Sequence, residues 1–277
     1  DEGVTPSEDF VLYYTLSRDE VGIDLLTYFP PDVAAGYYML LVAPEAVPST
    51  DQVIPKRMIM VFDRSGSMVG EKMDQAREAL KFAVGHLSEG DEFNIVDYST
   101  TVSSFADEVV TVTEETRQEA LEYIDAIEAI GGTNIHDALV RALDMMHGDE
   151  RAEMVVFMTD GKPTIGETQT QKILDGVAAA NAAKARIFVF GVGNEVNPHL
   201  LDRIAGEHGG TPSYVKPGED IEVAVSSFYT KVSSPVLADL ELEFTGARPR
   251  DYYPQTLPDL FRGGQVVQVG RLDNQGE

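Results

Sequence analysis

The hydrophobic residues of this chain follow two different patterns. Near both ends, short runs rich in Val, Leu, Ile and Tyr alternate with turns containing Pro or Gly, which is typical of β-strands. Three such runs open the chain and three close it: DFVLYYTL, VGIDLLTYF, GYYMLLVAP, VLADLELEF, RDYYP and QVVQVGRL. In the middle, uninterrupted apolar runs of strand length alternate with segments whose apolar residues recur at helical spacing.

The middle part therefore predicts alternating strands and helices. The predicted strands are RMIMVF, Glu92–Tyr98, Val102–Phe105, Glu153–Thr159 and Arg186–Val192. The predicted helices are Glu71–Leu87, Glu115–Ile130, Ile135–Met146, Thr168–Ala185, Pro198–Glu207 and Glu219–Val232. Because apolar strands without polar alternation are buried on both faces, we expect a doubly wound α/β domain with a mostly parallel sheet.

The strand-rich segments on either side suggest one β-domain interrupted by the α/β domain. Domains tolerate such insertions because their termini often lie close together. We assign residues 1–52 and 234–277 to the two parts of a β-sandwich, and residues 53–233 to the α/β domain. Two separate small β modules are the alternative, although each would have few strands to stabilise it.

Composition and charge narrow the range of partners. The chain has 277 residues, no Cys and a formal net charge of -26, so disulfides and thiolate metal sites are excluded. The negative charge argues against binding to nucleic acid or to anionic lipid. It fits either a high-salt habitat or ordinary solubility. No apolar run approaches the roughly 20 residues that span a bilayer. The first residues carry no basic and apolar leader, so we expect part of a longer protein.

Five oxygen-bearing side chains stand at or beside the predicted carboxyl ends of strands. They are Asp63, Ser65 and Ser67 of VFDRSGSMVG, Thr133 of GGTN and Asp160 of MTDG. This edge of an open α/β sheet is where ligands bind. Two carboxylates and three hydroxyls suit Mg²⁺, with Mn²⁺ or Ca²⁺ as substitutes, better than Zn²⁺. Because two acids only balance a divalent ion, we expect the metal to seek a further carboxylate oxygen from a partner.

These residues resemble the metal-ion-dependent adhesion site of von Willebrand factor type A domains at all five positions. The resemblance implies direct metal contact by Ser65 and Ser67, and by Thr133 in the ligand-bound state. It implies direct or water-mediated contact by Asp63 and Asp160. The flanks, such as GYYMLLVAPEA and PVLADLELEF, resemble bacterial relatives of the inter-alpha-trypsin inhibitor heavy chains. That likeness implies a VIT domain ahead of this segment in the parent chain, and a location outside the cell or at its surface.

We therefore expect a metal-dependent protein-binding or adhesion module, not an enzyme, whose Mg²⁺ coordinates an Asp or Glu side chain of a protein ligand. Arg64 and Lys162 are candidates for attracting that ligand, and solvated surface cations are the alternative reading. A second hypothesis is an intracellular A-domain subunit that recruits an ATPase through the same site, and a third is a metal-assisted hydrolase. The run Gly66 to Lys72 imitates a phosphate-binding loop, but its spacing is too short.

Overall fold

The computed structural model describes most of the chain, and all structural statements below concern the described residues. These are residues 21–30, 35–44, 55–149, 151–232, 235–237, 240–245, 248–255, 257, 260–261 and 265–273. The predicted strand DFVLYYTL and the predicted domain boundaries at 52–53 and 233–234 lie outside them.

The middle part is built on a seven-stranded sheet in the order β5-β4-β3-β7-β8-β9, with β6 beside β4. Its strands are β3 (Lys56–Asp63), β4 (Glu92–Tyr98), β5 (Val102–Ser104), β6 (Val110–Thr111), β7 (Ala152–Thr159), β8 (Arg186–Val192) and β9 (Pro212–Val215). The pairings from β4 through β3, β7 and β8 to β9 are parallel, while β5 and β6 run antiparallel to β4. The predicted α/β class with a mostly parallel sheet is confirmed.

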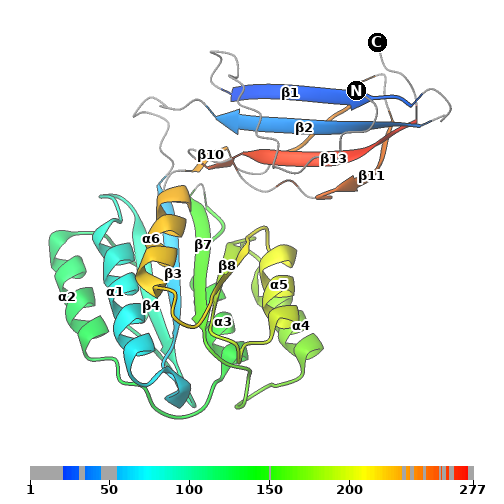
Figure 1. Ribbon diagram of the computed structural model, residues 1–277. Helices are drawn as coiled ribbons and strands as arrows, with labels where there is room; N and C mark the ends of the chain where they lie inside the picture. The colour runs from blue at the N-terminus through cyan, green and yellow to red at the C-terminus, as the bar shows by residue number, and fades with distance from the viewer. Residues whose placement is uncertain are drawn as a thin grey trace.

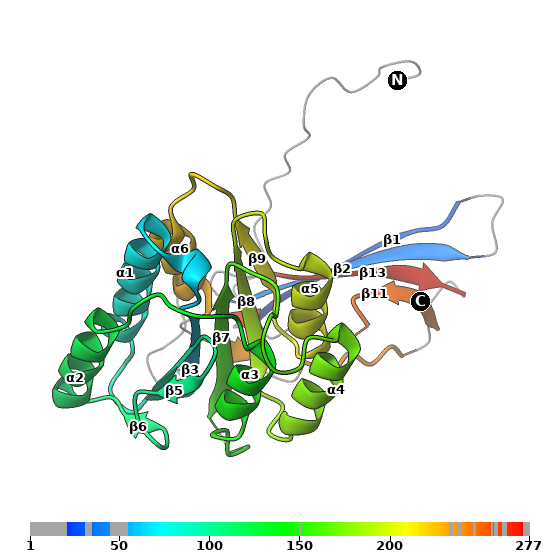
Figure 2. The ribbon, with the colours of Figure 1, turned by 90° about the horizontal axis from the view of Figure 1, so that it is seen from below.

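Helices cover both faces of this sheet (Figures 1 and 2). One face carries α1 (Glu71–Gly85), α2 (Glu114–Asp125) and α6 (Ile221–Val232), and the other carries α3 (Ile135–Leu143), α4 (Thr170–Ala180) and α5 (Pro198–Glu207). Successive residues of β3 point to opposite faces. Met58, Met60 and Phe62 join the α1–α2–α6 core, whereas Ile59 and Val61 join the α3–α4–α5 core. This two-sided burial explains why the strand is apolar at every position.

A four-stranded antiparallel sheet with the order β1-β2-β13-β11 joins the two ends of the chain. Its strands are β1 (Val21–Tyr28), β2 (Gly36–Pro44), β11 (Pro249–Tyr253) and β13 (Val266–Leu272). In the pairing of β2 with β13, Val42 lies opposite Val266 and Gly36 opposite Leu272. Segments from before and after the α/β part therefore share one sheet, which is the pairing that an inserted domain requires.

A second, two-stranded sheet pairs β10 (Pro235–Leu237) with β12 (Leu260–Phe261). The sequence predicts one strand throughout VLADLELEF, but residues 240–245 form no strand. Among the described residues, β12 spans two residues and pairs with β10, so it offers residues 240–245 no ladder partner there. Among the helices described, none has the length and apolar character needed to cross a membrane.

Candidate metal centre

The first part of the site is the turn that follows β3. This strand ends at Asp63, and the chain then enters a 3₁₀-helix (Gly66–Met68). The backbone N–H of Ser65 donates to Asp63 Oδ1 at 2.8 Å, and Ser65 Oγ lies 3.0 Å from Ser67 Oγ. Asp63 and Ser65 are buried. The turn therefore directs all three predicted side chains toward one another.

Asp160 reaches the same place from the neighbouring strand. Because β3 and β7 are adjacent and parallel, their carboxyl ends meet at one edge of the sheet. Ser67 Oγ donates to Asp160 Oδ1 at 2.6 Å, and Thr159 Oγ1 donates to Asp63 Oδ2 at 2.6 Å. Both carboxylates are fully buried. Each acid thus accepts a short hydroxyl hydrogen bond from the other strand end, and these bonds hold the ends of β3 and β7 together.

Thr133 completes the predicted set from a third loop. A Cβ added to Gly161 would lie 3.7 Å from Thr133 Oγ1 and 3.9 Å from Ser67 Oγ, so both hydroxyls border the turn after Asp160. The backbone of Thr133 is fixed by Thr164, whose Oγ1 accepts from Thr133 N–H at 2.9 Å. The structure therefore gathers all five sequence-predicted residues at one edge of the sheet.

The loop bearing Thr133 is also attached to the turn that carries the serines. Gly66 N–H donates to the carbonyl of Gly131 at 3.0 Å, and Ile130 N–H donates to the carbonyl of Arg64 at 2.7 Å. Gly131 has a φ of +85°, in the left-handed region that favours glycine. The position of Thr133 thus depends on this backbone conformation.

The electrostatics of the site fit a divalent cation. Burial raises the pKa of Asp63 above its usual value, and the charge of Asp160 adds to the rise, against hydrogen bonds from Thr159 and Ser65 that lower it. Burial, followed by the charge of Asp63, also raises the pKa of Tyr98 well above its usual value. Two buried carboxylates that repel each other are costly unless a cation compensates them. The five oxygen donors are therefore of the type that a hard divalent cation prefers.

Lys72, for which the sequence predicts no role, also lies at the site. Lys72 Nζ lies 2.6 Å from Asp160 Oδ2 and 3.2 Å from the carbonyl oxygen of Ser67. It is the second residue of α1, which starts directly beyond the serine turn. The signal in the sequence is a lysine five residues after Ser67, at the start of a predicted helix. The direction in which this side chain points depends on tertiary structure.

The two predicted ligand-contact cations differ in their surroundings. Arg64 is 17% exposed, and its Nε pairs with Asp97, which also accepts a hydrogen bond from Tyr123. A ligand contact by Arg64 would require breaking this pair. Lys162 is exposed beside Asp160 and forms no ion pair with the residues that the structure describes. Lys162 therefore remains the more accessible of the two cations.

No second metal centre is visible in the described ranges. Within them, no group of three or more His, Asp or Glu side chains is arranged to hold a metal ion, and the chain has no Cys. His136, three residues beyond Thr133, places its Nδ1 2.8 Å from Asp137 Oδ1. The candidate site therefore rests on two carboxylates and three hydroxyls.

Comparisons with known proteins agree with this geometry. Residues 56–214 match the family model of the von Willebrand factor type A domain. The chain is 30% identical over 276 residues to inter alpha-trypsin inhibitor, heavy chain 4, of Mus musculus, covering 97% of this chain and 28% of that protein. It is 30% identical over 249 residues to inter-alpha-trypsin inhibitor heavy chain H4 of Homo sapiens, covering 87% and 26%. The chain thus spans less than a third of the length of these relatives.

Solved structures show the same fold. A von Willebrand factor type A protein from Catenulispora acidiphila superposes with a TM-score of 0.68 at 18% identity, covering 96% of this chain and 68% of that one. The ArnB paralog VWA2 from Sulfolobus acidocaldarius gives a TM-score of 0.61 at 18% identity, covering 91% and 67%. The family-model match extends over more than half of the sequence, from β3 to β9. The chain belongs to the von Willebrand factor type A domain family.

Proposed function

We propose that this chain is a Mg²⁺-dependent protein-binding module of the adhesion type, and that the metal coordinates an Asp or Glu side chain of a protein ligand. The observation that carries the proposal is the pair of fully buried carboxylates, Asp63 and Asp160, held within reach of one another by Ser67 and Thr159. A divalent ion would compensate the negative charges of both buried acids, and a metal held by two acids accepts a further anionic oxygen.

Five side chains of this chain would share the coordination of the ion. Asp63, Ser65, Ser67, Thr133 and Asp160 would supply oxygen donors, and the bound metal would supply a positive centre for the ligand carboxylate. The hydrogen bonds among these groups fix their orientations before the metal arrives, which lowers the entropy cost of binding.

The likeness to the heavy chains supports the remaining parts of the proposal. We place the protein outside the cell or at its surface, with a VIT domain ahead of this segment in the parent chain. Mg²⁺ is the proposed resident ion, and Mn²⁺ or Ca²⁺ would substitute for it because both also prefer oxygen ligands.

The test is a calorimetric titration of Mg²⁺ into the wild-type chain and three variants. Asp63→Ala and Ser65→Ala each remove a proposed donor, so we expect both to lose Mg²⁺ binding. The control is Ser88→Ala, an exposed serine between α1 and β4, away from the carboxyl ends of β3 and β7, which should bind Mg²⁺ like the wild type. Equal Mg²⁺ affinity in all four proteins would refute the assignment, and circular dichroism would verify that each is folded.

A further inference from the structure

Lys72 adds a fixed positive charge to the proposed metal centre. Its ammonium lies 2.6 Å from Asp160 Oδ2 and 3.2 Å from the carbonyl oxygen of Ser67. Asp160 is fully buried, whereas the Lys72 side chain is 40% exposed. The aliphatic stem therefore reaches from the surface, at the first turn of α1, to a carboxylate that solvent does not reach.

The two oxygens of Asp160 have separate partners. Oδ1 accepts from Ser67 Oγ at 2.6 Å, on the side of the other proposed metal donors. Oδ2 accepts from Lys72 Nζ. Lys72 thus contacts the carboxylate without occupying the oxygen that points toward the serines. It is a positioning residue, because it acts on the metal through Asp160.

The charge count at the site changes when Lys72 is included. Two carboxylates alone would neutralise a divalent ion, so an external acid would be drawn to the loaded site by coordination to the metal and not by a net charge. With the Lys72 ammonium counted, the loaded site carries one net positive charge. Burial of both acids limits solvent screening, so this excess charge acts strongly at short range.

We propose that Lys72 keeps the metal-loaded site one charge positive, so that it weakens the affinity for the metal and strengthens the affinity for an acidic side chain. The inference rests on the proposed function and adds a determinant of ligand class. It explains how a chain with a net charge of -26 attracts a carboxylate locally, although its overall charge repels one.

The inference predicts changes of opposite sign at one residue. Lys72→Met keeps most of the aliphatic stem and removes the charge. We expect this variant to bind Mg²⁺ about three- to tenfold more tightly and to bind a carboxylate about three- to tenfold more weakly. Lys72→Arg keeps the charge, so both affinities should stay within about twofold of the wild-type values.

Two measurements separate the two affinities. Calorimetry gives the affinity for Mg²⁺. The carboxylate probe is ¹³C-labelled acetate, whose line broadening by the Mn²⁺-loaded protein reports binding at the metal. The matched control is Lys81→Met, which makes the same change in net charge on the same helix. It lies nine residues further along α1, about 13.5 Å from Lys72 at a rise of 1.5 Å per residue, beyond the ~10 Å screening length at 0.1 M salt.

Each outcome decides the question. Tighter Mg²⁺ and weaker acetate binding in Lys72→Met, with Lys81→Met unchanged, supports the inference. It is overturned if both affinities fall together, as a purely structural role requires, if neither changes, or if Lys81→Met behaves like Lys72→Met. If the wild-type chain itself does not bind Mg²⁺, the proposed function is refuted, and the inference is refuted with it.

Discussion

Asp63 is a residue whose burial opposes stability in the metal-free protein. Burial raises its pKa above the usual value near 4, and the hydrogen bonds from Thr159 and Ser65 lower it again only in part. A carboxyl with a raised folded-state pKa binds its proton more tightly in the folded chain than in the unfolded chain. Its stabilising contribution is therefore present below about pH 4 and is lost as the pH rises through the folded-state pKa.

Replacement of Asp63 by Asn removes this pH-dependent contribution. With a chelator present, we compare the free energy of unfolding of Asp63→Asn with that of the wild type. We expect the difference in favour of Asp63→Asn to increase from pH 4 to pH 7. Each unit of pKa shift corresponds to about 1.4 kcal/mol when the wild-type carboxyl is fully ionised. Urea unfolding at the two pH values measures the gap. A gap that stays constant or narrows with rising pH would contradict the argument.

The control for this comparison is an acid that is not buried. Asp74 has a 75% exposed side chain and pairs with Arg77 on the surface of α1. Asp74→Asn should differ from the wild type by less than about 0.5 kcal/mol at both pH values, because surface substitutions of this kind rarely cost more.

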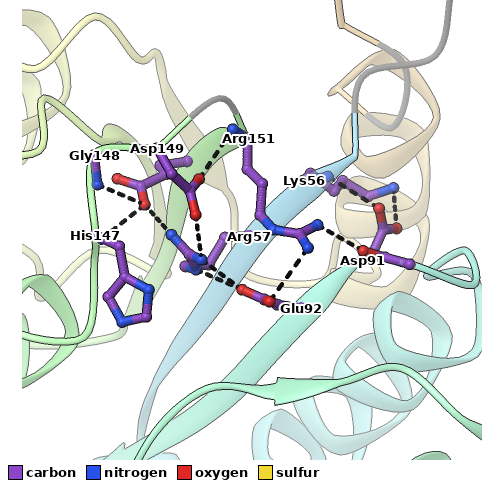
Figure 3. Close-up of polar contacts among 10 residues, drawn as sticks. Lys56, Arg57, Asp91, Glu92, His147, Gly148, Asp149 and Arg151 are labelled. Atoms are coloured by element: carbon purple, nitrogen blue, oxygen red, sulfur yellow. Dashed lines mark hydrogen bonds and ion pairs between the residues drawn. The ribbon is translucent and has the colours of Figure 1, made fainter.

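Arg57 is a second buried residue whose replacement has a predictable effect. It lies at the opposite end of β3 from Asp63 (Figure 3). Its buried guanidinium pairs with Glu92 at 2.6 Å, with Asp149 at 2.8 Å, and with Glu153. Arg57→Met should lower the free energy of unfolding by about 3–5 kcal/mol, because it leaves the buried carboxylate of Glu153 without its ion-pair partner. Arg151→Met removes a 29% exposed partner of Glu92 and should cost less than about 1 kcal/mol. Urea unfolding compares them, and equal losses would contradict this reading.

At the scale of elements, the bounds predicted from the sequence are most accurate for strands and helices whose own residues show a clear pattern of buried positions. The strands β4 and β8 and the helix α5 have the predicted bounds. The short strand β9 (Pro212–Val215) was not predicted, because Pro at its start and its four-residue length give no clear pattern. Its place comes from parallel pairing with β8, which is a tertiary contact.

The helix predicted from Glu115 to Ile130 shows why bounds near the site differ. The helix α2 ends at Asp125, although the apolar periodicity continues to Ile130. Beyond this end, Ile130 N–H bonds the carbonyl of Arg64, and the next residue accepts from Gly66. These contacts carry Thr133 to the metal site and are incompatible with a continuing helix. The sequence could predict that the donors after β3 and β7 meet, because the ends of adjacent parallel strands determine it. It could not predict the contacts that hold the Thr133 loop, or the side-chain direction of Lys72 or Arg64.

The loop that carries Thr133 gives the prediction at this scale. Gly131 has a φ of +85°, and a Cβ there would lie 2.7 Å from Thr100 Oγ1. Gly131→Ala should therefore displace the loop, cost about 1–3 kcal/mol of stability and weaken Mg²⁺ binding measurably. The matched control is Gly90→Ala, where φ is +88° and a Cβ would have no neighbour within 4 Å.

Gly90 lies in the turn before β4, at the other end of the sheet. Its substitution should share the backbone strain but leave Mg²⁺ affinity unchanged. Calorimetry and urea unfolding on both variants separate the two effects. If both variants bind Mg²⁺ like the wild type, the conformation of Gly131 does not position Thr133.

At the scale of the whole molecule, charge is the dominant property. The chain has 47 acidic residues against 21 Lys and Arg. Such an excess repels itself in the compact state, and the repulsion extends over about 30 Å at 0.01 M salt but only about 8 Å at 0.15 M. Folding therefore concentrates negative charge, and mobile cations should stabilise the native chain without binding at any particular site.

The melting temperature of the metal-free chain should accordingly rise with NaCl between 0.01 M and 0.15 M. A gain of 1 kcal/mol corresponds to about 2–4 °C for a chain of this size. Choline chloride at equal ionic strength should give the same rise, because screening does not distinguish the cations. A plateau above 0.15 M is expected if the charge serves ordinary solubility, whereas a rise that continues to 1 M indicates a high-salt habitat. A melting temperature that is constant or falls over the lower range would show that self-repulsion does not limit the stability of this protein.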